Sequence, residues 1–181
     1  MSDGQKRLRR TSSPIGTSHP SRVQLITGLA KWPDEMLVLL RASLDAEMHK
    51  RGMAFSVGAV GEGLAIAHFN ATPGLPKLQS AAKGTKNMDA SSRHGDRYSI
   101  KTVCKAKKTG TVYPDPEFKY KQLFEYMLIV QLNDDWSLRS IHQLSWSAFL
   151  HLCSWDKRMN AWYVAISKRV MTQATCIYPI E

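Results

Sequence analysis

The organisation of this chain is seen first in residues 87–102, which carry the sequence NMDASSRHGDRYSIKT. The pattern predicts two short strands joined by a turn at residues 93–96, with Asp89 in the first strand and Lys101 in the second. The second strand alternates, with Tyr98, Ile100 and Thr102 on one face and Ser99, Lys101 and Val103 on the other. Folded as a hairpin, this stretch brings a carboxylate and an ammonium group to one place.

Residues 56–63 are rich in glycine and lead to Glu62, a candidate second carboxylate for that place. A glycine-rich loop before a helix could cradle a phosphate on its N–H groups, but the Lys-Ser/Thr pair of a P-loop is absent. We therefore favour a helix over residues 57–69, whose small residues let it pack close to a sheet. Glu62 then either faces inward, where a carboxylate needs an ion partner or a metal, or stays exposed near the favourable helix N-terminus.

Composition and charge limit the classes of protein to which this chain can belong. The 181 residues, 43% of them hydrophobic, favour one domain with a buried core. The formal net charge of +10 favours a polyanionic partner, either nucleic acid or an anionic membrane surface. No apolar run approaches the roughly 20 residues of a membrane span, and no signal peptide begins the chain, so we expect a cytoplasmic, nucleoid-associated protein without a membrane partner. Three widely spaced cysteines predict reduced thiols.

The positive charge is concentrated in two segments. Residues 1–22 carry five Lys or Arg against one Asp, and residues 83–108 carry eight against two, which accounts for the whole excess. Few apolar residues lie in the first segment, so we predict a disordered basic arm, which either clamps nucleic acid or is a solvated tail. The second segment surrounds Asp89 and Lys101, and its basic side chains are either phosphate contacts or a solvated edge. The candidate nucleic-acid-binding residues are Lys83, Lys86, Arg93, Arg97, Lys105, Lys107 and Lys108.

The remaining segments predict helices followed by a sheet. Helices are expected at residues 23–29 and 33–50, the second ending at Gly52 and burying an apolar stripe in the core. That stripe consists of Met36, Leu39, Leu40, Leu44 and Met48. Residues 71–86 predict a loop. We expect a strand buried on both faces at residues 124–132 and its antiparallel partner at 136–144. A helix capped by Ser145 is expected at 145–153, and two short strands at 161–166 and 175–178. This order predicts one α/β or α+β domain over residues 23–181, with helices flanking a mixed central sheet.

Asp89, Glu62 and Lys101 are the side chains expected of a metal-dependent phosphodiesterase. A divalent cation held by carboxylates neutralises phosphate charge and lowers the pKa of a bound water. We expect Asp89 and Glu62, with the main-chain carbonyl of Ile100, to hold Mg²⁺ or Mn²⁺, and Lys101 to hold the attacking water. The six histidines show no zinc-binding spacing, and no Ser or Cys lies in a nucleophile elbow.

Four motifs in order resemble the PD-(D/E)XK nuclease superfamily, the fold of many restriction endonucleases, and most closely its small, largely uncharacterised domains. They are VGE at residues 60–62, AKGTKNMDA at 82–90, GDRYSIKT at 95–102 and FEYMLIVQLNDDW at 124–136. The resemblance covers about residues 50–150 and implies that Glu62, Asp89 and Lys101 take the family's catalytic positions. Ser99 falls where the family has Glu, Asp or Gln, so one carboxylate ligand is missing unless Glu62 replaces it.

Three functions follow as expectations. The first is a Mg²⁺-dependent endonuclease of restriction type that cuts double-stranded DNA as a homodimer, because two copies of one site cut two strands most simply. The second is a non-catalytic nucleic-acid-binding protein of the same restriction-endonuclease-like fold. The third is a partner-binding module that uses residues 136–162, which hold four of the five tryptophans, although such aromatics are more typical of a core.

Overall fold

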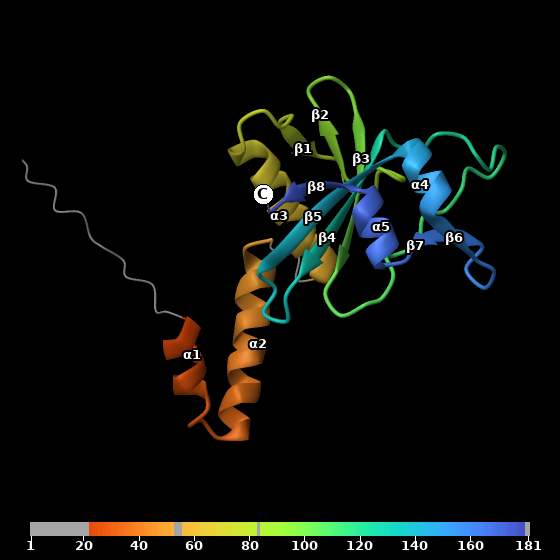
Figure 1. Cartoon of the computed structure of the whole chain (residues 1–181). Coiled ribbons are helices and arrows are strands. Elements are labelled where there is room, and N and C mark those ends of the chain that lie inside the picture. The colour runs from red at the N-terminus through yellow and green to blue at the C-terminus, as the bar shows by residue number, and fades with distance from the viewer. Residues whose placement is uncertain (1–21, 53–55, 83, 180–181) are drawn as a thin grey trace, which may run out of the picture. The chain divides into compact units, whose positions relative to one another are not determined.

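The chain divides into two compact units, Met1–Glu47 and Met48–Glu181, whereas the sequence favoured one domain from residue 23 (Figure 1). The computed structural model describes residues 22–52, 56–82 and 84–179. The predicted basic arm therefore lies outside the described residues except for Arg22, and Lys83 also lies outside them.

The first unit contains the predicted helix α1 (Arg22–Leu29) and most of the predicted helix α2 (Asp34–Lys50), whose last three residues belong to the second unit. Asp34 and Glu35 favour the start of α2 because acidic groups in the first turn complement the helix dipole. Gly52 ends it as predicted, with φ of +66° and its N–H bonded to the His49 carbonyl.

The prediction that the apolar stripe of α2 is buried in the core is wrong, because the helix has no buried residue. Met36, Leu39 and Leu44 are 44%, 59% and 49% exposed, and Val38 is 70% exposed. Apolar spacing predicts a face that favours burial, but only a second element can bury it. Among the described residues none does, so α2 presents an apolar surface.

The second unit is built on a six-stranded mixed sheet, as the sequence predicted. In sheet order the strands are β1 (Leu78–Ser80), β2 (Ala90–Ser92), β3 (Arg97–Val103), β4 (Tyr126–Leu132), β5 (Leu138–Ser145) and β8 (Thr175–Tyr178). β3 and β4 are parallel, and every other neighbouring pair is antiparallel. The central strand β4 is buried on both faces, as its continuous apolar run predicted.

The two faces of β4 belong to two cores. Leu128 and Val130 pack with Phe69 of α3 (Val57–Ala71), and Met127 and Ile129 pack with Phe149. The second core is covered by α4 (Trp146–Leu152), α5 (Lys168–Gln173) and a small sheet of β6 (Cys153–Asp156) and β7 (Ala161–Val164). The helices therefore flank both faces of the sheet (Figure 1).

Several predicted boundaries need correction. The first hairpin strand starts at Ala90, so Asp89 lies just before β2 and not inside a strand from residue 87. β1 lies in the predicted loop, and β6 and α5 were not predicted. The tryptophan-rich region contributes to the core, since Trp162 is 4% exposed and packs against Phe149.

Candidate functional site

Asp89 is fixed at the open end of the hairpin by four hydrogen bonds, one of which runs from the Ala81 N–H to the Asp89 carbonyl at 2.9 Å. Its N–H donates to the Tyr98 carbonyl at 2.8 Å, which extends the pairing of β2 and β3 by one residue. Its Oδ2 accepts the Ile100 N–H at 2.6 Å and the Ser99 hydroxyl at 3.3 Å. Among the described residues, none forms a hydrogen bond or ion pair with Oδ1, so one oxygen of this carboxylate remains available to a ligand.

Lys101 lies where the strand alternation predicted it, beside that carboxylate. Its Nζ is 3.8 Å from Asp89 Oδ2, and its side chain is only 22% exposed. This distance is longer than a good hydrogen bond between charged groups. The ammonium group is therefore held near Asp89 but keeps donors for another partner.

Glu62 faces inward, which decides between the two positions that the sequence left open. It is half-buried on α3 and lines a cavity of about 190 Å³ together with Asp89, Met88 and Thr85. Burial raises the pKa of Glu62, the negative charge of Asp89 raises this pKa further, and the Lys101 ammonium lowers it. A carboxylate whose charge is disfavoured by burial and by a second carboxylate in the same cavity would be stabilised by a cation there.

Gly61 allows α3 to carry Glu62 to this position. A Cβ at residue 61 would collide with the Thr102 side chain of β3 and would lie 2.8 Å from the Thr102 Cβ. The helix starts at Ser56, whose hydroxyl accepts the Ala59 N–H at 3.1 Å. Gly61 therefore serves close helix–sheet packing, as predicted, and the segment is a helix from Val57, so the phosphate-loop alternative is wrong.

Ser99 and Ile100 support the site from β3. Ser99 is 1% exposed and donates to Asp89, so its hydroxyl orients a carboxylate. The N–H and C=O groups of one strand residue point the same way. The Ile100 carbonyl therefore faces the side on which Asp89 lies, as a metal-ligand position requires.

These residues fit a small hard cation and not zinc. Within the described part of the chain, no group of three or more His, Cys, Asp or Glu side chains could hold a metal ion. A closed zinc site needs about four such ligands, whereas Mg²⁺ is commonly held by one or two carboxylates and retains several waters. Glu62, the free oxygen of Asp89 and the Ile100 carbonyl match the second case.

The predicted phosphate contacts fall into two groups. Arg97 is engaged inside the molecule, with Nη2 2.8 Å from Glu125 Oε1 and Nε 3.1 Å from Oε2, and the hydrogen bond from Arg97 lowers the pKa of Glu125. Lys108 lies 3.1 Å from Asp156 and over the Tyr163 ring. These two pairings give both cations a structural role that the sequence did not predict.

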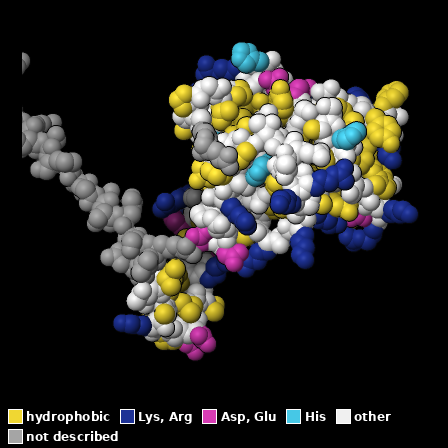
Figure 2. Space-filling model, in the orientation of Figure 1, with side chains coloured by type: hydrophobic (Ala, Val, Ile, Leu, Met, Phe, Trp, Pro, Cys, Tyr) yellow, Lys and Arg dark blue, Asp and Glu magenta, His cyan; other side chains and the backbone are white. Residues whose placement is uncertain are grey.

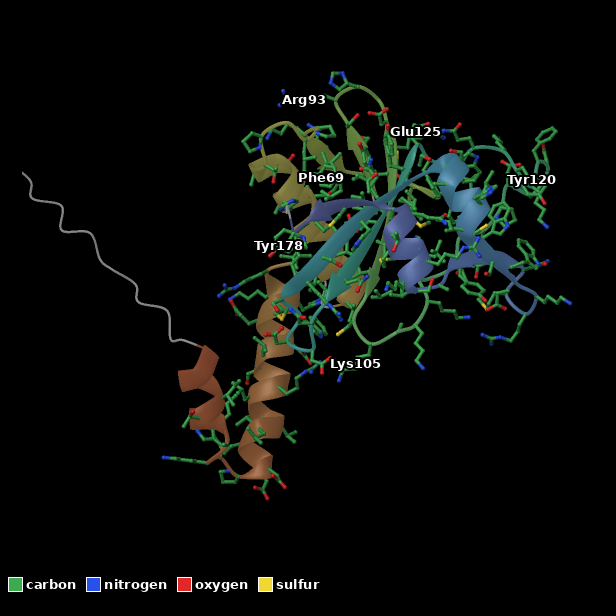
Figure 3. The ribbon with its side chains drawn as sticks, viewed as in Figure 1. Phe69, Arg93, Lys105, Tyr120, Glu125 and Tyr178 are labelled. Atoms are coloured by element: carbon green, nitrogen blue, oxygen red, sulfur yellow. The ribbon has the colours of Figure 1, made fainter. Side chains whose placement is uncertain are left out.

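The second group is available to a ligand. The side chains of Lys86, Arg93 and Lys107 are exposed and make no hydrogen bond or ion pair to any described residue, and the Lys105 side chain makes only a 3.6 Å exposed pair with Asp134. Figure 3 shows Arg93 at the hairpin turn and Lys105 beyond the other end of β3. Strand β3 spans roughly 20 Å, so these cations could contact different phosphates of one duplex. Lys and Arg are interspersed with apolar side chains on the face in Figure 2.

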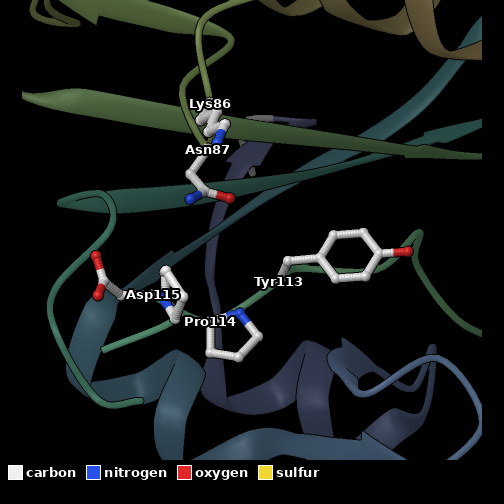
Figure 4. Close-up of a pocket in the computed structure, with 6 residues that line it drawn as sticks. Lys86, Asn87, Tyr113, Pro114 and Asp115 are labelled. Atoms are coloured by element: carbon white, nitrogen blue, oxygen red, sulfur yellow. The ribbon is translucent and has the colours of Figure 1, made fainter. Parts of the chain in front are cut away.

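A larger cavity beside the carboxylates was not predicted. It has a volume of about 730 Å³ and is lined by Lys86, Asn87, Tyr113, Pro114, Asp115 and Pro116 (Figure 4). The sequence signal for it is the run of aromatic side chains at positions 113, 118 and 120, all at least half exposed. Of these aromatic residues the fold sets only Tyr113 in the cavity with Asn87.

Comparison with known proteins adds no family to this geometry. No protein-family model matches the chain, and no curated protein matches it. Among the described residues, no helix is long and apolar enough to cross a membrane.

Glu62→Gln should leave the domain at least as stable as the native protein at pH 7.5, raising Tm by roughly 1–2 °C. The reason is that burial and Asp89 disfavour the charged form of Glu62. The pKa of Glu62 is higher in the folded domain than in the unfolded chain. The charged form of Glu62 therefore destabilises the fold above the folded-state pKa, and this destabilisation disappears as the pH falls toward 4.5. Thermal unfolding at pH 7.5 and pH 4.5 measures the difference, with exposed Glu117→Gln as the control. A lower Tm for Glu62→Gln at pH 7.5 would instead indicate a structural carboxylate.

Proposed function

We propose that this protein is a Mg²⁺-dependent DNA endonuclease of restriction type, with a PD-(D/E)XK-like site. The observation that carries the proposal is that Glu62 and Asp89 line one cavity beside the Lys101 ammonium group. Two acids and a lysine beside a strand pair are the groups that phosphodiester hydrolysis by this route requires. Mn²⁺ would fit the same oxygen ligands.

Each residue then has a defined task. Ser99 and the Ile100 N–H hold Asp89 through Oδ2, which directs its other oxygen to the cation. Glu62 and the Ile100 carbonyl complete the protein's ligands, and bound Mg²⁺ would neutralise phosphate charge and lower the pKa of a water. The Lys101 ammonium, 3.8 Å from Asp89, orients the attacking water and donates to the phosphate oxygens as their charge grows.

Double-stranded DNA is the substrate that the charge distribution favours. The net charge of +10 attracts a polyanion, and the side chains of Lys86, Arg93 and Lys107 are exposed and have no partner among the described residues. Contacts of this kind release counterions, so the affinity for DNA should fall steeply with salt. In a cell, such binding would associate the protein with the nucleoid.

A second candidate function is DNA binding without cleavage. It is favoured by Ser99, because a hydroxyl is a poorer metal ligand than the carboxylate that the nuclease pattern has at this position. Glu62 compensates only if it reaches the cation together with Asp89. The two candidates therefore differ in whether the cavity between these carboxylates holds Mg²⁺ during turnover.

Incubation of the purified protein with plasmid and phage DNA separates the two candidates. Reactions with Mg²⁺, with Mn²⁺ and with EDTA are compared on a gel. The endonuclease should give discrete fragments with either metal and none with EDTA, whereas salt-sensitive binding without any product would favour the second candidate.

We also propose that the active form is a homodimer that uses α2. Soluble monomers rarely expose large contiguous apolar patches, yet Met36, Leu39, Leu40 and Leu44 on one side of α2 are all exposed. Acidic residues begin this helix and basic residues end it. An antiparallel second copy would therefore set the acidic end of one helix against the basic end of its partner.

Leu39→Glu should convert a dimer into a monomer, because it places a charge in this apolar surface. Light scattering coupled to gel filtration measures the mass, and Ala42→Glu, exposed on another face of the same helix, should remain dimeric. Nicking of single strands should persist in the monomer while coordinated double-strand cleavage is lost. A native protein that is monomeric at all concentrations would overturn this proposal.

A further inference from the structure

The cavity of about 730 Å³ next to the carboxylates has the size and lining of a small-molecule site. One wall holds Lys86 and Asn87, and the facing wall is the segment from Tyr113 to Pro116. Figure 4 shows the Asn87 amide directed from its own wall toward Tyr113 and Pro114. The cavity therefore combines an aromatic ring, a hydrogen-bonding amide and a cation.

One short loop separates this cavity from the carboxylate cavity. Gly84, Thr85, Met88 and Asp89 line the smaller cavity, whereas the intervening Lys86 and Asn87 line the larger one. Asn87 has φ of +60°, a backbone conformation that asparagine tolerates better than most residues. This turn sends neighbouring side chains to opposite sides, so the two cavities share one short loop as their common wall.

The chemistry of the lining fits a nucleobase. The Tyr113 side chain is 50% exposed and offers a ring for stacking, and the Asn87 amide offers a donor and an acceptor to a base edge. Lys86 is exposed at the rim, where it can meet a phosphate. Asp115 does not repel such a ligand strongly, because its carboxylate binds Lys121 Nζ at 3.0 Å and the N–H groups of Glu117 and Phe118.

We propose that this cavity receives one unstacked base of the DNA strand whose phosphate lies at Glu62 and Asp89. The inference rests on the proposed function for its choice of DNA as ligand, but it concerns binding and not hydrolysis. A base can enter only after it leaves the helix, which costs least where it is already unpaired. The protein therefore recognises DNA in which one nucleotide is extruded or unpaired at the cleavage position.

Fluorescence anisotropy in EDTA tests the binding of an unstacked base in this cavity without any cleavage. The probes are a perfect duplex and the same duplex with one bulged nucleotide, both labelled at one end. The native protein should bind the bulged duplex about tenfold more tightly, and Tyr113→Ala should remove that preference. Phe118→Ala is the matched control, because Phe118 is 65% exposed on the same segment and does not line the cavity.

Asn87→Gly provides the second variant, since glycine keeps the positive φ and removes only the amide. It should reduce the preference for the bulged duplex without changing Tm. Equal affinity of the native protein for both duplexes, or a preference that Tyr113→Ala retains, would overturn the base pocket. Either result leaves the endonuclease proposal standing, whereas failure to bind any DNA would remove both.

Discussion

Asp89→Asn should lower the rate of DNA cleavage about 1000-fold while the affinity for DNA changes less than about threefold. The substitution removes the charge that the cation needs but keeps an oxygen that can accept the Ile100 N–H, now bonded at 2.6 Å. The hairpin should therefore stay folded. Single-turnover cleavage of a short duplex in Mg²⁺ measures the rate, and anisotropy in EDTA measures the affinity.

Lys101→Ala should give a similar loss of cleavage by a different route, since it removes the ammonium group 3.8 Å from Asp89. Lys157→Ala is the matched control, because this lysine is exposed and lies outside the site. Lys101→Arg should recover little activity, because a planar guanidinium does not replace a compact ammonium group. Cleavage at the native rate in either Asp89→Asn or Lys101→Ala would exclude this site as the active site.

Local sequence patterns predicted the central part of this fold because each pattern had a single structural interpretation. The alternation along residues 98–102 fixed which side chains of β3 share a face, and the apolar run before Asn133 identified a strand buried on both faces. Ser145 accepts the Ala148 N–H at 3.2 Å, as a helix N-cap should. These features depend on neighbours within a few residues.

The errors arose where a partner far along the chain decides the structure. β1 is three residues long and exists because it pairs with β2. The position of Asp89 before β2 follows from its bond to Tyr98, and the pairing of Arg97 with Glu125 joins residues 28 apart. Periodicity carries no information on such partners, so it also could not show that none of the described residues buries the stripe of α2.

The site itself was partly predictable. Asp89 and Lys101 meet because a hairpin must bring its strands together, which the turn at residues 93–96 already indicated. Glu62 was placed only as one of two alternatives, since nothing local tells a helix which side faces a sheet. Tyr113 and Asn87 were missed because their facing positions depend on the fold as a whole.

Gly61→Ala should destabilise the second unit by about 2 kcal/mol, within the range seen when side-chain volume is forced into a packed core. The new Cβ would collide with the Thr102 side chain and lie 2.8 Å from its Cβ. Thr102 is β-branched and belongs to β3, so it cannot rotate out of the way and the helix must move. Chemical denaturation of the full chain measures the loss.

Gly63→Ala is the matched control for this substitution. It lies two residues further along the same helix, and a Cβ there meets nothing within 4 Å. Alanine favours helix by about 0.5–1 kcal/mol over glycine, so this variant should be more stable than the native protein. Equal effects of the two substitutions would show that helix propensity, and not contact with Thr102, decides the outcome.

Gly61→Ala also tests whether the packing of α3 and the cleavage of DNA depend on the same contact with Thr102. Glu62 follows Gly61 directly, so a helix displaced from Thr102 should carry this carboxylate away from Asp89. Gly61→Ala should therefore reduce cleavage under conditions where the domain remains folded, and Gly63→Ala should not. Adding Thr102→Gly to Gly61→Ala removes the colliding atoms and should restore part of the activity. Activity that stays lost in this double variant, with the fold intact, would mean that Gly61 acts on the site by some route other than its contact with β3.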